Sequence, residues 1–269
     1  MYQSHLPEEY IAKIFEQFCE IRGVREAPPI RLMKARDRST LARHCIPGDH
    51  DREAMWSDSF FGGEWLARYI LEHPNEFAGK RVIDIGSGSG IVAIAAALVG
   101  AHVIAIDSNP CAYHAIHTNA KLNNVSIEVI EGNAFGLRYG LAALYETADI
   151  ITAADLFYYH AGVPYLAEFL SGLALKDKTI FVTSQDEDLG PLLKTNGVEL
   201  KSVSNSPLHD GLRFVKLTKS DGSPKTVERR SAPTTPERYS QRLNRRFALQ
   251  RAQQRAQRLH KKRAGIDPT

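Results

Sequence analysis

The chain has 269 residues, of which 43% are hydrophobic and 24% are charged, the ordinary range for a globular protein with one substantial core. No apolar run approaches the roughly 20 residues of a transmembrane helix, and the first ten residues contain two glutamates and no apolar signal segment. Its three cysteines are far apart in the sequence, which favours a reducing compartment. We therefore expect a soluble, cytoplasmic protein.

The net charge of +3 conceals a division along the chain. Residues 1–224 carry 21 basic and 28 acidic side chains, net −7, whereas residues 225–269 carry 13 basic and three acidic ones, net +10. This asymmetry indicates a basic arm appended to an acidic domain.

The first 55 residues are expected to form a helical extension. Within residues 8–21, Ile11, Ile14, Phe15 and Phe18 recur at spacings of three and four, which predicts an amphipathic helix. Residues 27–51 contain prolines, a glycine and many charges, and are expected to be a loop or short helices. A further helix is expected at 64–72.

From residue 79 onward, apolar strand-like segments alternate with helix-length segments. This pattern predicts an α/β fold, a Rossmann-like, doubly wound sheet of seven strands. The strands are expected at 82–85, 102–106, 127–130, 149–153, 179–182, 199–204 and 213–218, and the helices at 91–99, 111–122, 137–145 and 163–173. A short loop joins the last two strands, so we expect the final strand to run antiparallel, as in a hairpin.

Beyond this alternating domain, which spans 56–219, the composition changes. Residues 220–236 are rich in Ser, Pro and Thr and are expected to be a linker. Residues 237–269 place apolar side chains along one face among arginines, which predicts a basic helical tail.

A glycine-rich turn follows the first strand of the alternating domain. The segment reads Asp84-Ile85-Gly86-Ser87-Gly88-Ser89-Gly90, with a strand before it and an Ala-rich helix after it. Glycines let the backbone turn sharply and let a ligand approach closely. A dinucleotide fingerprint requires glycine at position 91, which is Ile91, so the spacing disfavours NAD.

Polar residues also end the next two strands. Asp107 and Ser108 close the second strand, where an acidic side chain can accept hydrogen bonds from both ribose hydroxyls. The D-x-G-x-G-x-G segment followed by an acidic strand end resembles the class I methyltransferases. The resemblance implies S-adenosylmethionine as cofactor, with Asp84 near its methionine amino group, the turn from Gly86 to Gly90 along its amino-acid moiety, and Asp107 on its ribose. It also places Asn133 and Ala134, after the third strand, at the adenine.

The segment from Trp56 to Leu71 is similar to the protein-lysine methyltransferase family that includes the electron transfer flavoprotein beta-subunit lysine methyltransferase. Trp56 and Gly62-Gly63 match the family pattern, whereas Phe60 and Phe61 replace its usual Trp and Pro. The fourth strand ends in Asp155-Leu156-Phe157-Tyr158, which keeps the family's Asp, Phe and Tyr.

We therefore predict transfer of methyl groups to a protein lysine. Trp56 and Asp155 are also expected to contact the cofactor. Asp155 is expected to orient the amine together with Tyr158, while Trp56, Phe157 and Tyr158 wall the pocket. An ordinary core role for Trp56 and Phe157 stays open. No metal site is expected.

Other functions fit the same turn. An RNA or ribosome-associated methyltransferase would use the basic tail to bind phosphates. The fourth strand does not end in the Asn-Pro-Pro-Tyr type of sequence used for base amines, which argues against it. A small-molecule methyltransferase and a non-catalytic, cofactor-binding subunit also remain open, and the tail itself is equally compatible with a solvated extension.

Overall fold

The computed structural model describes residues 7–45, 54–134, 141–156, 163–184, 198–205 and 213–220. All of these belong to one compact unit, Met1–Ser223. The expected tail at 237–269, and the expected linker except for Ser220, lie outside the described residues. In the part of the chain that is described, no helix has the length and apolar character needed to span a bilayer.

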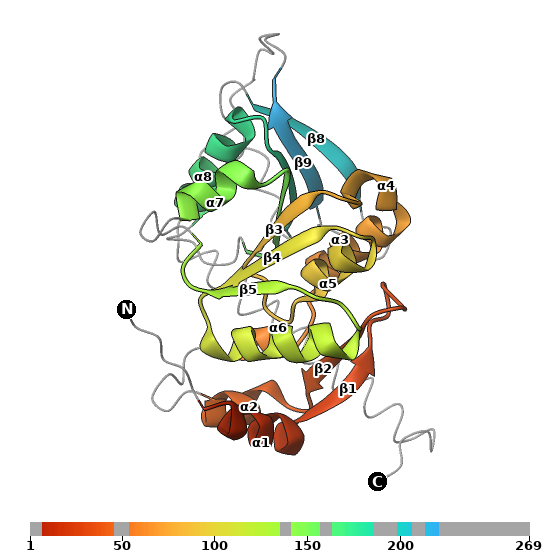
Figure 1. The fold of residues 1–269 in the computed structure, drawn as a ribbon, viewed down its shortest axis with the longest axis vertical. Helices are drawn as coiled ribbons and strands as arrows, with labels where there is room; N and C mark the ends of the chain where they lie inside the picture. The colour runs from red at the N-terminus through yellow and green to blue at the C-terminus, as the bar shows by residue number, and fades with distance from the viewer. Residues whose placement is uncertain are drawn as a thin grey trace. The chain divides into compact units, whose positions relative to one another are not determined.

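The centre of the unit is the expected seven-stranded sheet (Figure 1). Its strands lie in the order β5 (Glu128–Glu131), β4 (His102–Asp107), β3 (Arg81–Ile85), β6 (Ile150–Ala154), β7 (Thr179–Ser184), β9 (Arg213–Lys219) and β8 (Val198–Asn205). The pairs from β5 to β7 are parallel, and β9 is antiparallel to both β7 and β8. The doubly wound fold with an antiparallel last strand is therefore confirmed.

Helices cover both faces of this sheet (Figure 1). On one face, α3 (Phe61–Glu72), α4 (Pro74–Phe77), α5 (Ile91–Leu98) and α6 (Pro110–Leu122) share a core that includes Val82. On the other, α7 (Leu141–Thr147) and α8 (Val163–Leu175) pack on Ile83 and Ile85. Because successive strand side chains point to opposite faces, β3 contributes to both cores and is buried throughout from Val82.

The N-terminal segment differs from the expectation. Helix α1 (Glu8–Phe18) ends three residues before Ile21, because β1 (Cys19–Gly23) begins there and pairs with β2 (Arg31–Ala35). The expected loop or short helices at 27–51 thus contain a strand as well as helix α2 (Arg38–Cys45). Besides β1, the main-chain groups of β2 bond to Asn119 in α6 and to Asn123 just after it, far away in the sequence, so local patterns do not reveal these partners.

Candidate functional site

The glycine turn lies at the carboxyl end of β3, where α5 begins. Gly86, Gly88 and Gly90 all have left-handed backbone angles, with φ of +63°, +56° and +83°. Such angles are strained for other residues, which is why this turn uses glycine. The amides of Gly86 and Ser87 donate to the carbonyl oxygen of Ile106, at 2.8 and 3.1 Å, and tie the turn to β4.

Neighbouring side chains pack closely against the turn. A Cβ atom on Gly86 would lie 2.2 Å from Cδ2 of Leu156, and one on Gly90 would lie 3.3 Å from Cγ2 of Ile116. Positive φ therefore favours glycine at both positions, and the neighbouring side chains leave little room for a Cβ. A side chain at position 86 would force Leu156, which follows β6, to move.

Asp84, in β3, binds the turn through the hydroxyl of Ser87. Its side chain is 2% exposed, and its carboxylate accepts hydrogen bonds from the hydroxyls of Ser87 and Thr152, the latter at 2.7 Å. Burial raises the pKa of Asp84 to about 6, although the hydrogen bonds from Ser87 and Thr152 oppose the rise. Thr152, one strand away, is a partner that the sequence did not suggest.

The raised pKa of Asp84 predicts a pH-dependent stability. The folded protein binds this proton more tightly than an unfolded chain, whose Asp titrates near pH 3.9, so the contribution is fully present below about pH 4 and is lost as pH rises through about 6. We expect the free energy of unfolding to lose on the order of 3 kcal/mol from this group between about pH 4 and about pH 7. Urea unfolding of wild type and Asp84→Asn at both ends of this range measures it. A difference between the two proteins that does not change with pH contradicts the assignment.

Asp107 reaches from the end of β4 into the turn. Its Oδ2 accepts from the amide of Gly88 at 2.8 Å, and its Oδ1 accepts from the amide of Asn109 at 2.9 Å. Burial raises the pKa of this carboxyl, and the amides of Asn109, Gly88 and Ser108 oppose the rise. Asp107 and the glycine turn thus form one hydrogen-bonded unit, while the side chain of Ser108 is exposed.

The residues expected at the adenine follow β5. Gly132 donates to the carbonyl oxygen of Asp107 at 2.8 Å, which brings this segment beside the end of β4. Asn133 is exposed and Ala134 is 7% exposed. The hydroxyl of Tyr145 in α7 donates to the carbonyl oxygen of Ala134 at 2.9 Å, a contact between distant segments that the sequence did not indicate.

Asp155 follows β6 at the same end of the sheet, with a left-handed φ of +53°. Its Oδ2 accepts from the amide of Gly63 at 3.0 Å, so the carboxylate caps the N-terminus of α3, where the helix dipole favours negative charge. Burial raises the pKa of Asp155 to about 6, and the amides of Gly63 and Gly62 oppose the rise. The Gly62-Gly63 pair therefore holds the expected catalytic carboxylate.

Thr183, at the end of β7, lies beside this contact. A Cβ on Gly62 would be 2.5 Å from Oδ1 of Asp155 and 2.6 Å from Oγ1 of Thr183. Thr183 is fully buried, and its hydroxyl has no hydrogen-bond partner in the structure as described.

Because an unpaired buried hydroxyl costs about 1–3 kcal/mol, we expect Thr183→Val to raise the free energy of unfolding by about 1 kcal/mol. Thr152→Val, a matched change at a buried hydroxyl that donates to Asp84, should lower the free energy of unfolding instead. Chemical denaturation of both variants tests the contrast. Equal destabilisation by both substitutions would show that Thr183 is hydrogen-bonded in solution.

A buried charge cluster lies near the start of α3. Lys34 of β2 is 8% exposed, and its Nζ lies 3.4 Å from Asp58 Oδ1 and 3.5 Å from Glu64 Oε1. The hydroxyl of Ser59 bridges Lys34 and Glu64. The cluster anchors the N-terminal hairpin beside the helix end that holds Asp155, and the negative charge of Glu64 adds to the rise in the pKa of Asp155.

Of the aromatic residues expected to wall the pocket, Trp56 is placed by the structure. It lies in the 3-10 turn η1 (Met55–Ser57), is 5% exposed, and packs its ring on Phe15 with centroids 5.5 Å apart. Its Cα lies 3.7 Å from the position that a Cβ on Gly88 would take, so its backbone lies next to the turn. Its ring packs in the N-terminal core. Phe157 and Tyr158 lie outside the described residues.

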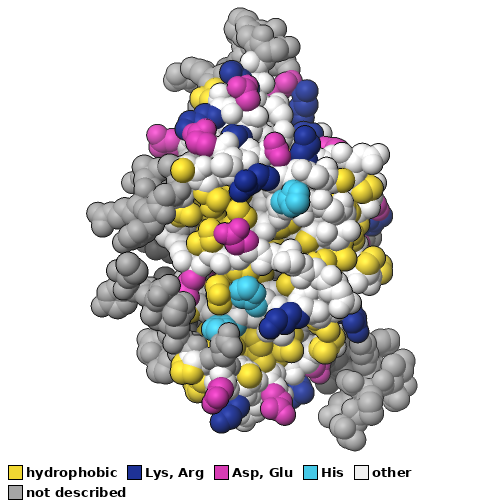
Figure 2. All heavy atoms as spheres, in the orientation of Figure 1, with side chains coloured by type: hydrophobic (Ala, Val, Ile, Leu, Met, Phe, Trp, Pro, Cys, Tyr) yellow, Lys and Arg dark blue, Asp and Glu magenta, His cyan; other side chains and the backbone are white. Residues whose placement is uncertain are grey.

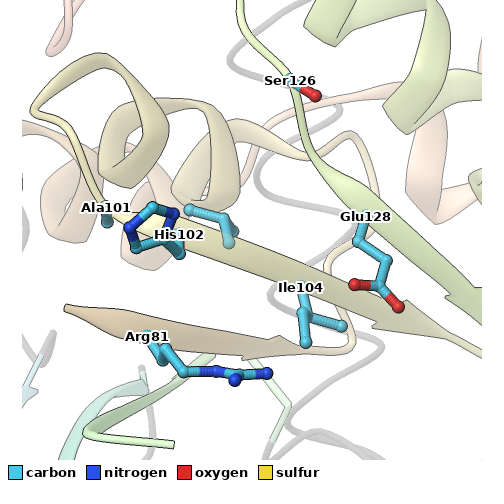
Figure 3. A pocket seen from close by; sticks show the side chains of 7 residues that line it. Arg81, Ala101, His102, Ile104, Ser126 and Glu128 are labelled. Carbon is cyan, nitrogen blue, oxygen red and sulfur yellow. The ribbon is translucent and has the colours of Figure 1, made fainter. Parts of the chain in front are cut away.

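A separate hollow lies at the opposite end of the sheet. It has a volume of about 540 Å³ and is lined by residues at the amino ends of three strands, including Arg81, His102 and Glu128 (Figure 3). Since ligands of open α/β sheets bind at the carboxyl ends of the strands, this hollow is not part of the site. Within the described ranges no three His, Cys, Asp or Glu side chains are grouped as metal ligands.

The comparisons with known proteins agree with this geometry. Residues 49–189 match the family described as lysine methyltransferase. The electron transfer flavoprotein beta subunit lysine methyltransferase of Rattus norvegicus is 38% identical over 108 residues, covering 39% of this chain and 40% of that protein. EEF1A lysine methyltransferase 3 of Xenopus tropicalis is 32% identical over 136 residues, covering 49% of this chain and 56% of that protein. The matches thus span less than two thirds of these curated relatives.

A solved structure shows the fold. The 16S rRNA N2 G1207 methyltransferase of T. thermophilus, in complex with AdoMet and guanosine, superposes with a TM-score of 0.52 at 13% identity. The match covers 75% of this chain and 50% of that one. Because the family model covers more than half of the sequence, from before Trp56 to beyond β7, this chain belongs to the lysine methyltransferase family.

Proposed function

We propose that this chain is an S-adenosylmethionine-dependent methyltransferase that transfers methyl groups to a lysine side chain of another protein. The observation that carries the proposal is the glycine turn at the end of β3, with the carboxylate of Asp107 hydrogen-bonded into it from β4. Family membership supports the same reaction class.

The residues of the turn fit such a cofactor. Gly86 and Gly88 offer backbone without side chains, so a ligand can approach closely. An ionised carboxylate has about four lone-pair sites. Asp107 accepts from the amides of Gly88, Asn109 and Ser108, and the one site left over can accept a ribose hydroxyl. We assign the adenine to the segment Asn133-Ala134, whose backbone Tyr145 fixes.

The cofactor, when bound, supplies an electrophilic methyl group. The enzyme must bind the lysine of the acceptor protein as a neutral amine. A lysine of pKa about 10.4 loses its proton at a cost of about 4–5 kcal/mol at pH 7. With a pKa of about 6, Asp155 is mostly ionised at neutral pH and can accept a hydrogen bond from the incoming amine. Alignment of the reactants can supply roughly 7–11 kcal/mol, so a strong base is not required. Tyr158 stays a predicted partner of Asp155.

The two curated relatives named above act on different proteins by their names, so the proposal names the class of acceptor, a protein lysine. On the face shown in Figure 2, basic and acidic side chains are interspersed among the coloured residues, without a continuous basic area. The basic tail, which an RNA function would use, lies outside the described residues. The cytoplasmic location expected from the sequence stays a prediction.

The full chain, incubated with a cell lysate and cofactor labelled in its methyl group, tests the proposal. We expect the label in polymer that protease destroys and ribonuclease leaves intact, and at lysine after hydrolysis. Label that ribonuclease removes, and that disappears on deletion of the residues after Ser220, would instead establish the RNA function. Cofactor binding without transfer to any polymer or small molecule would establish a non-catalytic subunit.

A further inference from the structure

Asn119 of α6 connects two segments that are distant in the sequence. Its side chain is fully buried, and its Oδ1 accepts from the amide of Met33 in β2 at 2.7 Å. Its Nδ2 donates to the carbonyl oxygen of Ser89, within the glycine turn, at 2.8 Å. One amide group therefore bonds to the N-terminal hairpin at one end and to the turn at the other.

Two further contacts join the turn to α6 and to the segment that precedes α3. Cα of Ile116, three residues before Asn119, is 3.4 Å from the Cβ position of Gly90, and Cα of Trp56 is 3.7 Å from that of Gly88. Trp56 packs on Phe15 of α1, and both belong to a core that includes the first turn of α6. Figure 1 shows α6 lying between the sheet and the N-terminal elements. The back of the turn is thus supported by the N-terminal segment through α6.

This support matters because of the composition of the turn. Three residues in left-handed conformations within five positions are all glycines, which have the widest backbone freedom of any residue. A buried hydrogen bond to Ser89 restricts that freedom at the centre of the turn, where the neighbouring residues are Gly88 and Gly90. Loss of the bond leaves a buried carbonyl without its donor.

We propose that Asn119 is a positioning residue through which the N-terminal hairpin, β1 and β2, sets the conformation of the glycine turn and thereby the affinity for the cofactor. The inference rests on the proposed function, since it concerns the same cofactor. Asn119 acts from behind the turn, through Ser89. By linkage, cofactor binding must in turn tighten the contact between Asn119 and β2.

The substitution Asn119→Asp tests this, because it keeps the size of the side chain while it replaces the NH₂ donor by an oxygen and, when ionised, adds a negative charge. An aspartate keeps the acceptor for Met33 but places an oxygen against the carbonyl oxygen of Ser89, so the turn must shift. We expect the Kd for S-adenosylhomocysteine, the demethylated product, to rise by about tenfold or more in calorimetry. The KM for the cofactor should rise similarly, with the KM for the protein acceptor unchanged.

Asn123, four residues after Asn119 and immediately after the end of α6, provides the matched control. It accepts from the amide of Arg31 at 2.9 Å and donates to the carbonyl oxygens of Arg31 at 2.6 Å and of Asn119 at 2.7 Å, so it holds the same hairpin through bonds that do not involve the glycine turn. Asn123→Asp should lower the melting temperature as Asn119→Asp does, yet change the Kd by less than about twofold. Equal Kd values for the two variants would overturn the inference.

A measurement on the wild-type chain keeps the test decisive if Asn119→Asp does not fold. Saturation with S-adenosylhomocysteine should slow hydrogen exchange at Met33 as well as at Gly88 and Gly90, with β8 unchanged as the internal control. Unchanged exchange at Met33, while the turn becomes protected, would refute the coupling between the hairpin and the turn but not the proposed function. If the wild-type chain binds no S-adenosylhomocysteine, the proposed function fails, and this inference fails with it.

Discussion

Replacing Asp107 by alanine is expected to weaken the binding of S-adenosylhomocysteine by at least about a hundredfold. The carboxylate holds the amides of Gly88 and Asn109, and it is the group that we assign to the ribose. Hydrogen bonds to a charged group contribute about 1.5–3 kcal/mol each, and about 1.4 kcal/mol is a tenfold change in affinity. Loss of the bond to the ribose together with the bond that holds the amide of Gly88 therefore suffices. Isothermal calorimetry on the full chain measures the effect.

Asp149 offers a control for Asp107. Its Oδ2 accepts from the amide of Arg81 at 2.8 Å, which is the same kind of contact at the opposite end of the sheet. Asp149→Ala should reduce stability and leave the affinity for S-adenosylhomocysteine unchanged. An Asp107→Ala protein that still binds within about threefold of wild type would contradict the assignment of the ribose site.

Methyl transfer should fall by about 10²–10³ in kcat when Asp155 is replaced by asparagine, while affinity for the cofactor changes by less than about tenfold. Asparagine tolerates the left-handed φ of +53°, so the backbone is kept. In asparagine an NH₂ group replaces one of the two oxygens that accept from the amides of Gly62 and Gly63. The negative charge that would face the amine is lost as well. Steady-state kinetics with labelled cofactor and the protein acceptor that takes up the label measures kcat.

Asp177 separates this effect from a general cost of the substitution. It is also an aspartate with positive φ, +62°, and is exposed after α8. Asp177→Asn should leave kcat unchanged. Tyr158→Phe should lower kcat if Tyr158 acts with Asp155, as the sequence predicts, and unchanged rates in both Asp155→Asn and Tyr158→Phe would remove these residues from the mechanism.

The glycine turn and its acidic neighbour were predictable from the sequence because they depend on local constraints. Three alternate glycines between an apolar strand and an Ala-rich helix leave few conformations, and the structure confirms φ above zero at each. The strand that ends at Asp107 is parallel to β3, so its carboxyl end meets the same edge of the sheet. The carboxyl ends of β3 and β4 lie side by side because of the fold, so this proximity can be predicted without knowing any side-chain contact.

The N-terminal segment could not be predicted in the same way. Strand β2 lies in a segment whose prolines and charges are typical of a loop. It is a strand because β1 pairs with one of its edges and Asn119 and Asn123 bind main-chain groups at the other. Similarly, the antiparallel direction of β9 follows from the short loop before it, whereas its insertion between β7 and β8 depends on pairing across the sheet.

By itself, the sequence determined the order and type of the elements from residue 79 onward, the glycine turn, and the acidic side chains at the strand ends, because these follow from periodicity and backbone sterics within a few residues. Only the tertiary structure decided what those side chains touch. Asp155 binds the start of α3, Asp84 binds Thr152, and Asn119 joins the hairpin to the turn. Each contact joins residues that the chain separates by dozens of positions, and only packing of the whole unit brings them within hydrogen-bond distance.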